Sequence, residues 1–216
     1  MFDVLSGHDL PLPVASHASL VAWQDPSAGL VLLDLNSNQK VVTLPVTDNV
    51  EALDFSRDGR YLAVGSVESV IYDLSANAQN VVLDGIGRPA NCLAFPPDSS
   101  GVAAGMQGRT IHLSKLARDG NSQNAVHSRV LHCHAGIVRA VLYSADGETL
   151  FSAASDRTIR VWDVATGQQR AVLKGHTNNV DSLALSPDGR TLASAGSDNT
   201  VRIWRTASER DVRDFP

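Results

Sequence analysis

Short apolar runs separated by turn signals make up most of the chain, and they predict β-strands. Residues 180–185 form a mostly apolar run that suits a strand buried on both faces. The Pro-Asp-Gly segment at 187–189 is a tight turn, because proline fixes φ and glycine tolerates a positive φ. A second strand is predicted at 192–195 and a third at 200–204, which is rich in β-branched and aromatic residues. No helical pattern of useful length competes, so we expect an all-β protein.

This strand unit repeats along the chain. A shift of 42 residues aligns His134–Trp162 with His176–Trp204 without a gap, and 14 of the 29 aligned positions are identical. A period of this length is typical of units with four strands. Weaker copies precede these two. We therefore predict a single domain over residues 1–216, built of five units with approximate bounds 7–44, 45–84, 85–132, 133–174 and 175–205.

Three short motifs indicate the kind of repeat. Gly175-His176 opens the last unit, Ser-Pro-Asp-Gly at 186–189 marks its first turn, and Trp162-Asp163 ends the unit before it. With these motifs the chain resembles the WD-repeat family of β-propellers, strongly in residues 130–205 and in diluted form upstream. Arg205 departs from the family pattern, because it replaces the aspartate of the Trp-Asp dipeptide.

The resemblance implies a ring of four-stranded blades around a central channel. We expect about five blades. Residues 4–8 match residues 172–176, so Phe2–Leu5 are candidates for the missing outer strand of the last unit. The ring either closes through this N-terminal strand or is incomplete.

The resemblance also implies two sets of side chains with defined roles. The first is a buried hydrogen-bonded network of imidazole, hydroxyl, carboxylate and indole groups, which satisfy one another's polar atoms. Its members are His134, Ser152, Asp156 and Trp162 in one unit and His176, Ser194, Asp198 and Trp204 in the next.

The second set surrounds the channel mouth and is the expected partner-binding surface. It carries both charge signs, which favours a partner with an arginine or lysine anchor. Its members are Asn179, Asp181, Ser197, Ile137, Arg139, Ser155, Pro89, Asn91, Gln107, Asn49, Glu51 and Val67.

Composition narrows the function classes. The 18 Lys and Arg against 23 Asp and Glu leave a net charge of −5, and no basic run is present, so we expect no nucleic-acid partner. No apolar stretch approaches the roughly 20 residues of a membrane helix, so we expect no membrane partner. Two cysteines are too few for a disulfide framework, which favours a reducing, cytoplasmic setting.

Two candidate chemistries are weighed and set aside. Ser, His and Asp together would suit a hydrolase, but the set occurs twice at one repeat offset, and no Gly-x-Ser-x-Gly motif is present. His127, His132, Cys133 and His134 could hold zinc, yet no Cys-x-x-Cys pair supports a site. We interpret this cluster as part of a solvated loop and residues 117–128 as a surface insertion. We therefore expect no catalytic residue, metal or cofactor.

The leading hypothesis is a non-enzymatic scaffold that binds a protein or peptide through loops on a rigid propeller. Two alternatives remain open: a carboxyl-terminal regulatory or sensor part of a larger bacterial multidomain protein, and a propeller hydrolase. Fold alone does not distinguish them.

Overall fold

The computed structural model contains only β-strands as regular elements in the residues that it describes. These residues are 14–25, 29–46, 49–67, 69–75, 79–82, 89–116, 126–132 and 134–206. Their strands form five antiparallel sheets, so the predicted all-β fold with five blade-like sheets is confirmed. Within these residues there is no helix of the length and apolar character needed to cross a membrane.

Each sheet is a meander in which strands adjacent in sequence are paired. The first sheet contains β1 (Val14–His17), β2 (Leu20–Asp25), β3 (Gly29–Asp34) and β4 (Gln39–Leu44). The second contains β5 (Ala52–Phe55), β6 (Tyr61–Gly65), β7 (Val70–Asp73) and β8 (Gln79–Val82). The third contains β9 (Ala90–Ala94), β10 (Gly101–Met106), β11 (Thr110–Lys115) and β12 (Val126–His132). The fourth contains β13 (Val138–Tyr143), β14 (Thr149–Ala154), β15 (Thr158–Asp163) and β16 (Gln169–Lys174). The fifth contains β17 (Val180–Leu185), β18 (Thr191–Gly196) and β19 (Val201–Arg205).

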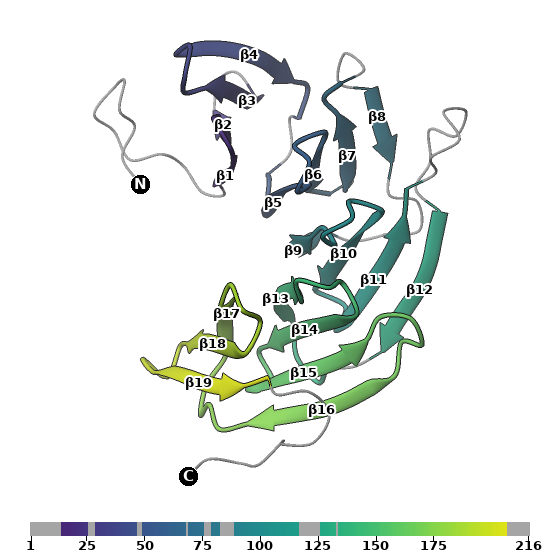
Figure 1. The fold of residues 1–216 in the computed structure, drawn as a ribbon, viewed down its shortest axis with the longest axis vertical. Coiled ribbons are helices and arrows are strands. Elements are labelled where there is room, and N and C mark those ends of the chain that lie inside the picture. The colour runs from purple at the N-terminus through teal and green to yellow at the C-terminus, as the bar shows by residue number, and fades with distance from the viewer. Residues whose placement is uncertain are drawn as a thin grey trace.

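The five sheets follow one another around an arc, with the first strand of each sheet on the concave side (Figure 1). These inner strands contact one another in chain order: β1 with β5, β5 with β9, β9 with β13, and β13 with β17. Among the described residues, no strand pair joins the first sheet to the last. Closure through Phe2–Leu5 stays a prediction, because these residues lie outside the described part of the chain.

The turn after each inner strand explains why one short motif recurs. In the fifth sheet, the Ser186 hydroxyl donates to Asp188 Oδ1 at 2.5 Å and accepts the Thr191 N–H at 2.9 Å. Gly189 adopts a φ of 70° in this turn, a conformation that glycine tolerates without strain. The same serine and aspartate contacts recur in the fourth sheet between Ser144 and Asp146. The motif therefore fixes the hairpin locally.

Apolar layers between adjacent sheets form the core. Between the fourth and fifth sheets, Phe151 and Ile159 pack against Val180 and Leu192, and each of these side chains is at most 4% exposed. Burying a side chain of this size contributes about 1.5–3 kcal/mol. The second, third and fourth sheets each pack one face on the sheet before and the other on the sheet after, so their strands need apolar residues on both faces.

The outer strand of the third sheet differs from the sequence-based prediction. The predicted insertion at 117–128 overlaps β12, and His127 and His132 lie on this strand rather than in a solvated loop. β12 pairs with β11 from Val126 to His132, with one irregularity in the register. β12 is the outer strand of its sheet, so it can carry many polar residues. Its sequence therefore lacks the apolar pattern that predicts a strand.

Asp54 on β5 connects the second and third sheets. Its Oδ2 accepts a hydrogen bond from the Phe95 N–H at 2.9 Å, across the boundary between the two sheets. Burial raises the pKa of the Asp54 carboxyl to about 6, although backbone N–H groups of Phe95 and Phe55 oppose the shift. No cation of the described residues forms an ion pair with it.

This raised pKa predicts a pH-dependent effect of Asp54→Asn. The folded protein holds the Asp54 proton more tightly than the unfolded chain, so this carboxyl lowers stability as the pH rises from 3.8 to about 6, and the loss persists above that range. The asparagine variant keeps an oxygen acceptor for Phe95. It should be more stable than wild type at pH 7 by up to about 3 kcal/mol, and the difference should be much smaller near pH 4, close to the unfolded pKa. Urea unfolding at both pH values tests this, and a difference independent of pH would contradict it.

Candidate interaction face and its supporting network

A chain of buried hydrogen bonds connects β14, β15 and the turn between them to the segment before β13. His134 Nδ1 lies 2.9 Å from Asp156 Oδ2, and His134 Nε2 lies 2.8 Å from Ser152 Oγ. The Trp162 Nε1–H donates to the same Ser152 Oγ at 2.9 Å. The structure thus brings all four residues of the first predicted network together.

These groups satisfy one another with a single assignment of protons. The indole N–H donates to the serine oxygen, the serine hydroxyl donates to His134 Nε2, and His134 Nδ1–H donates to Asp156. Because Ser152 is fully buried and the His134 side chain has no exposed surface, loss of any one partner would leave a desolvated polar group. The network therefore anchors the turn before β13 to β14 and β15.

The fifth sheet carries the same arrangement, and it too brings all four predicted residues together. His176 bridges Asp198 at 2.9 Å and Ser194 at 2.8 Å, and Trp204 Nε1–H donates to Ser194 at 2.9 Å. The environment of the indole differs: Trp162 is 4% exposed, while Trp204 is only partly buried.

Each aspartate of the network accepts more hydrogen bonds than its histidine provides. Asp156 also receives the Ala135 N–H at 2.9 Å and both the N–H and hydroxyl of Thr158 at 3.1 and 2.7 Å. Burial raises the pKa of Asp156, but these hydrogen bonds outweigh burial, so its pKa lies below the ordinary value. The pKa of Asp198 is also lowered, mainly by the Thr200 hydroxyl. Both carboxylates are therefore charged at neutral pH.

Thr158 and Thr200 are network members that the motif comparison missed. Each threonine hydroxyl donates to the aspartate two positions before it, at 2.7 Å. The signal was present, because these threonines are one of the identical pairs in the 42-residue alignment.

The Ser-His-Asp distances are those of a nucleophile with its base, but access is closed. Burial lowers the pKa of His134, although Asp156 opposes the shift, so the imidazole is neutral and could accept a proton. Yet Ser152 is completely buried and its oxygen already accepts the indole N–H of Trp162. A substrate carbonyl cannot reach this oxygen, so the arrangement supports a structural role for the network.

The predicted partner-binding residues all lie at one end of the sheets. Each is at the start of an inner strand or in the turn after the second strand of a sheet, and a hairpin places these two positions together. Backbone hydrogen bonds show this pairing directly: Ser155 N–H to Ile137 O and Ser197 N–H to Asn179 O, both 2.9 Å. Asn91 Nδ2 reaches Val138 O at 3.4 Å, so the third and fourth sheets meet at this end.

Four of these residues form one polar group across the boundary between the fourth and fifth sheets. Arg139 Nε donates to Ser155 Oγ at 2.7 Å and lies 3.4 Å from Asp181 Oδ1. The Ser197 hydroxyl donates to Asp181 Oδ2 at 2.5 Å. The side chains of Arg139 and Asp181 are 40% and 38% exposed, so this group remains open to a partner.

The other predicted residues are less organised. Val67 and Ile137 expose apolar surface, 57% and 39% of their areas. Among the described residues, no side-chain hydrogen bond joins the members from the second sheet to those of the fourth and fifth; these members are Asn49, Glu51 and Val67. Pro89 is partly buried and Gln107 is exposed, both beside the third sheet.

The histidine-rich segment does not form a metal site in the described part of the chain. No group of three or more His, Cys, Asp or Glu side chains is positioned to hold a metal ion there. His132 is exposed on β12, and His134 is engaged by Ser152 and Asp156. Cys133 lies outside the described residues.

Comparison with known proteins places these features in a family. The family model described as "WD domain, G-beta repeat" matches residues 38–72, 125–163 and 167–205, which together make up just over half of the 216 residues. WD repeat-containing protein SL1-17 of Schistosoma mansoni is 31% identical over 170 residues, covering 75% of this chain and 54% of that protein. Coronin-7 of Rattus norvegicus is 29% identical over 165 residues, covering 69% of this chain and 17% of coronin-7. Small ribosomal subunit protein RACK1 of Drosophila melanogaster is 32% identical over 73 residues, covering 34% of this chain and 23% of RACK1. The chain thus spans about half or less of the length of these relatives.

Proposed function

The chain belongs to the WD-domain, G-beta repeat family, and from this premise we propose that it is a non-enzymatic scaffold that binds a protein or peptide partner. The observation that supports this most is the contrast between the two candidate sites. The Ser-His-Asp sets are sealed within the sheets, while the Arg139 and Asp181 group at the strand ends is held by hydrogen bonds to Ser155 and Ser197 and is open to solvent. Its relative RACK1 is, by name, a component of a larger assembly.

The partner-binding surface is the polar group of Arg139, Ser155, Asp181 and Ser197, with the exposed apolar Ile137 beside it. An apolar contact next to fixed polar groups of both signs suits a partner that inserts one basic side chain toward Asp181 and packs its stem on Ile137. We also propose a reducing, cytoplasmic setting, since Cys92 is a free thiol.

Charge reversal at this group should reduce partner capture without loss of stability. An exposed ion pair contributes about 0–1 kcal/mol, so Arg139→Glu and Asp181→Lys should change the melting temperature little. Each should lower capture of the partner from source lysate at least about fivefold. Asp181→Lys places a like charge before the partner's basic anchor, and Arg139→Glu removes the cation that orients Asp181 and Ser155. The exchange Arg139→Asp with Asp181→Arg restores the ion pair in reverse and should still fail to capture.

Glu148→Lys provides the matched control, because Glu148 is an exposed charge in the turn at the opposite end of the fourth sheet. Capture by this variant should equal that of wild type. Quantitative mass spectrometry of the captured proteins measures the comparison. If the two charge reversals and the double exchange capture as much partner as wild type and the control do, the binding surface lies elsewhere.

A further inference from the structure

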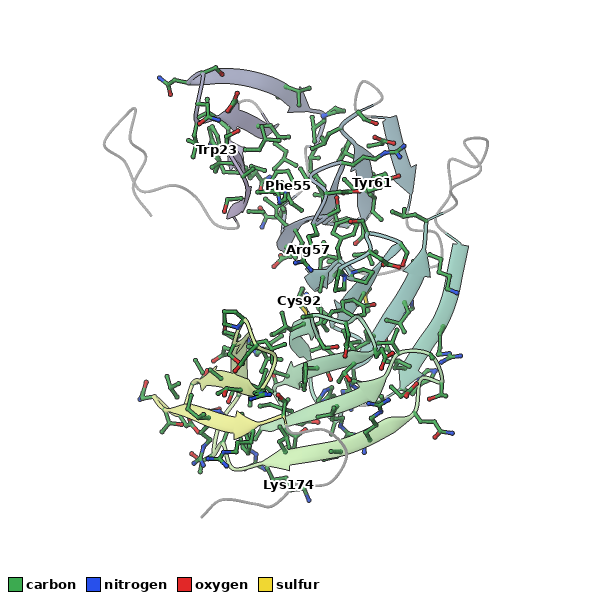
Figure 2. All side chains as sticks on the ribbon, viewed as in Figure 1. Trp23, Phe55, Arg57, Tyr61, Cys92 and Lys174 are labelled. Carbon is green, nitrogen blue, oxygen red and sulfur yellow. The ribbon has the colours of Figure 1, made fainter. Side chains whose placement is uncertain are left out.

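A second polar site lies at the opposite end of the inner strands from Arg139. A pocket of ≈ 400 Å³ is lined by residues that follow or end β5, β9 and β13, so three successive sheets contribute to it. Figure 2 shows Arg57, one of the lining residues, on the inner side of the arc near the end of β5. β13 runs from Val138 to Tyr143, with Arg139 at its start and the pocket residues Tyr143 and Ala145 at its end.

Asp54 is a negative group of this pocket that lacks a cation. Its side chain is held by the Phe95 N–H, which fixes the carboxylate without neutralising it. The side chain is mostly withdrawn from water, and no Lys, Arg or His among the described residues forms an ion pair with it. A carboxylate in such a position gains more from an incoming cation than an exposed carboxylate does, because less water must be displaced.

The remaining walls favour an elongated apolar stem. Leu93, Phe95 and Val141 line the pocket and are at most 9% exposed. Arg57 also lines it, but its side chain is exposed, so its charge faces solvent. Asp98, in the turn that follows β9, interacts electrostatically with the lining residue Tyr143 and adds a second negative charge near the pocket.

We propose that this pocket receives the side chain of a lysine or arginine from a protein partner, with its cation paired to Asp54 and its aliphatic stem packed on Leu93, Phe95 and Val141. A basic side chain combines the two features that the pocket offers, a fixed desolvated anion and apolar walls. The site is separate from the Arg139 and Asp181 group, so the chain would contact partners at both ends of its inner strands.

The test uses blocked amino acids as probes for the full chain. Nα-acetyl-lysine methylamide and Nα-acetyl-arginine methylamide are titrated into isotope-labelled protein, and backbone amide shifts are followed by NMR. Nα-acetyl-norleucine methylamide, which has the aliphatic stem but no charge, is the control. We expect at least one of the two basic probes to cause saturable shifts at the amides of Phe95 and Ala145, and norleucine to bind at least about tenfold more weakly.

Two variants separate binding from structure. Asp54→Asn keeps the acceptor for the Phe95 N–H and should weaken the basic probe at least about tenfold, while a purely structural Asp54 would leave its affinity unchanged. Arg57→Glu lies on the exposed rim and should strengthen the basic probe several-fold by removing a like charge. Weaker binding to Arg57→Glu, equal binding by norleucine, or unchanged affinity in a folded Asp54→Asn would each overturn the proposal. Arg139→Glu should leave the probe affinity unchanged, so failure of the proposed partner surface can be told apart from failure of this pocket.

Discussion

Trp162→Ala should lower the free energy of unfolding by about 3–5 kcal/mol, the range for truncating a buried tryptophan. Trp162 packs in the layer between the third and fourth sheets with Ile111, Leu131 and Leu150. Its removal opens a cavity there and also leaves Ser152 without its indole donor. Trp204→Ala should cost less, because this ring is only partly buried and packs at the margin of the layer between the last two sheets.

The repeat alone predicts equal losses at the two tryptophans, and their different burial revises that expectation. Urea unfolding followed by circular dichroism measures both. Trp162→Phe separates the two contributions, since it keeps most of the ring volume and removes only the N–H donor, and it should fall between wild type and Trp162→Ala. Equal losses at Trp162 and Trp204 would show that burial does not set the effect.

Asp156→Ala should lower the free energy of unfolding by about 1–3 kcal/mol, because its buried hydrogen-bond donors are left without an acceptor. Four donors lose their acceptor at once: the imidazole of His134, the Ala135 N–H, and the N–H and hydroxyl of Thr158. Asp198→Ala should behave similarly, since its side chain is 4% exposed against 9% for Asp156 and it accepts the equivalent bonds.

Asp146→Ala is the control for this series. Asp146 is exposed and accepts hydrogen bonds only within its own turn, so its loss should cost about 1 kcal/mol or less. Thermal melts of the three variants under identical conditions give the comparison. The same small loss of stability in all three variants would contradict a structural role for the network.

Local patterns were sufficient to predict the strands of the last sheet. β17, β18 and β19 were expected within one residue of their bounds, because the Ser-Pro-Asp-Gly and Asp-Asn turns mark their ends. The prediction was poorest for outer strands. β12 has one sheet neighbour and a polar sequence, so it lacks the apolar pattern that identifies strands buried on two faces.

The candidate sites show the same division. Both His-Ser-Asp-Trp sets were expected because their members recur at one offset, and recurrence reports contacts within a unit. The Arg139–Asp181 pair and the pocket at Asp54 join residues from different units. Their geometry depends on how one sheet is rotated against the next. The spacing of residues along the chain does not predict that rotation.

β19 also bears on how the protein behaves when concentrated. In the described part of the chain this strand has no outer neighbour, and Val201 and Ile203 are 69% and 62% exposed, although the equivalent Ile159 is fully buried. An apolar strand with a free edge invites strand addition by another molecule. Arg202 and Arg205 lie on the same short strand with no acidic residue between them, so two such edges repel each other. We therefore expect Arg205, the arginine that departs from the Trp-Asp motif, to oppose self-association through this edge.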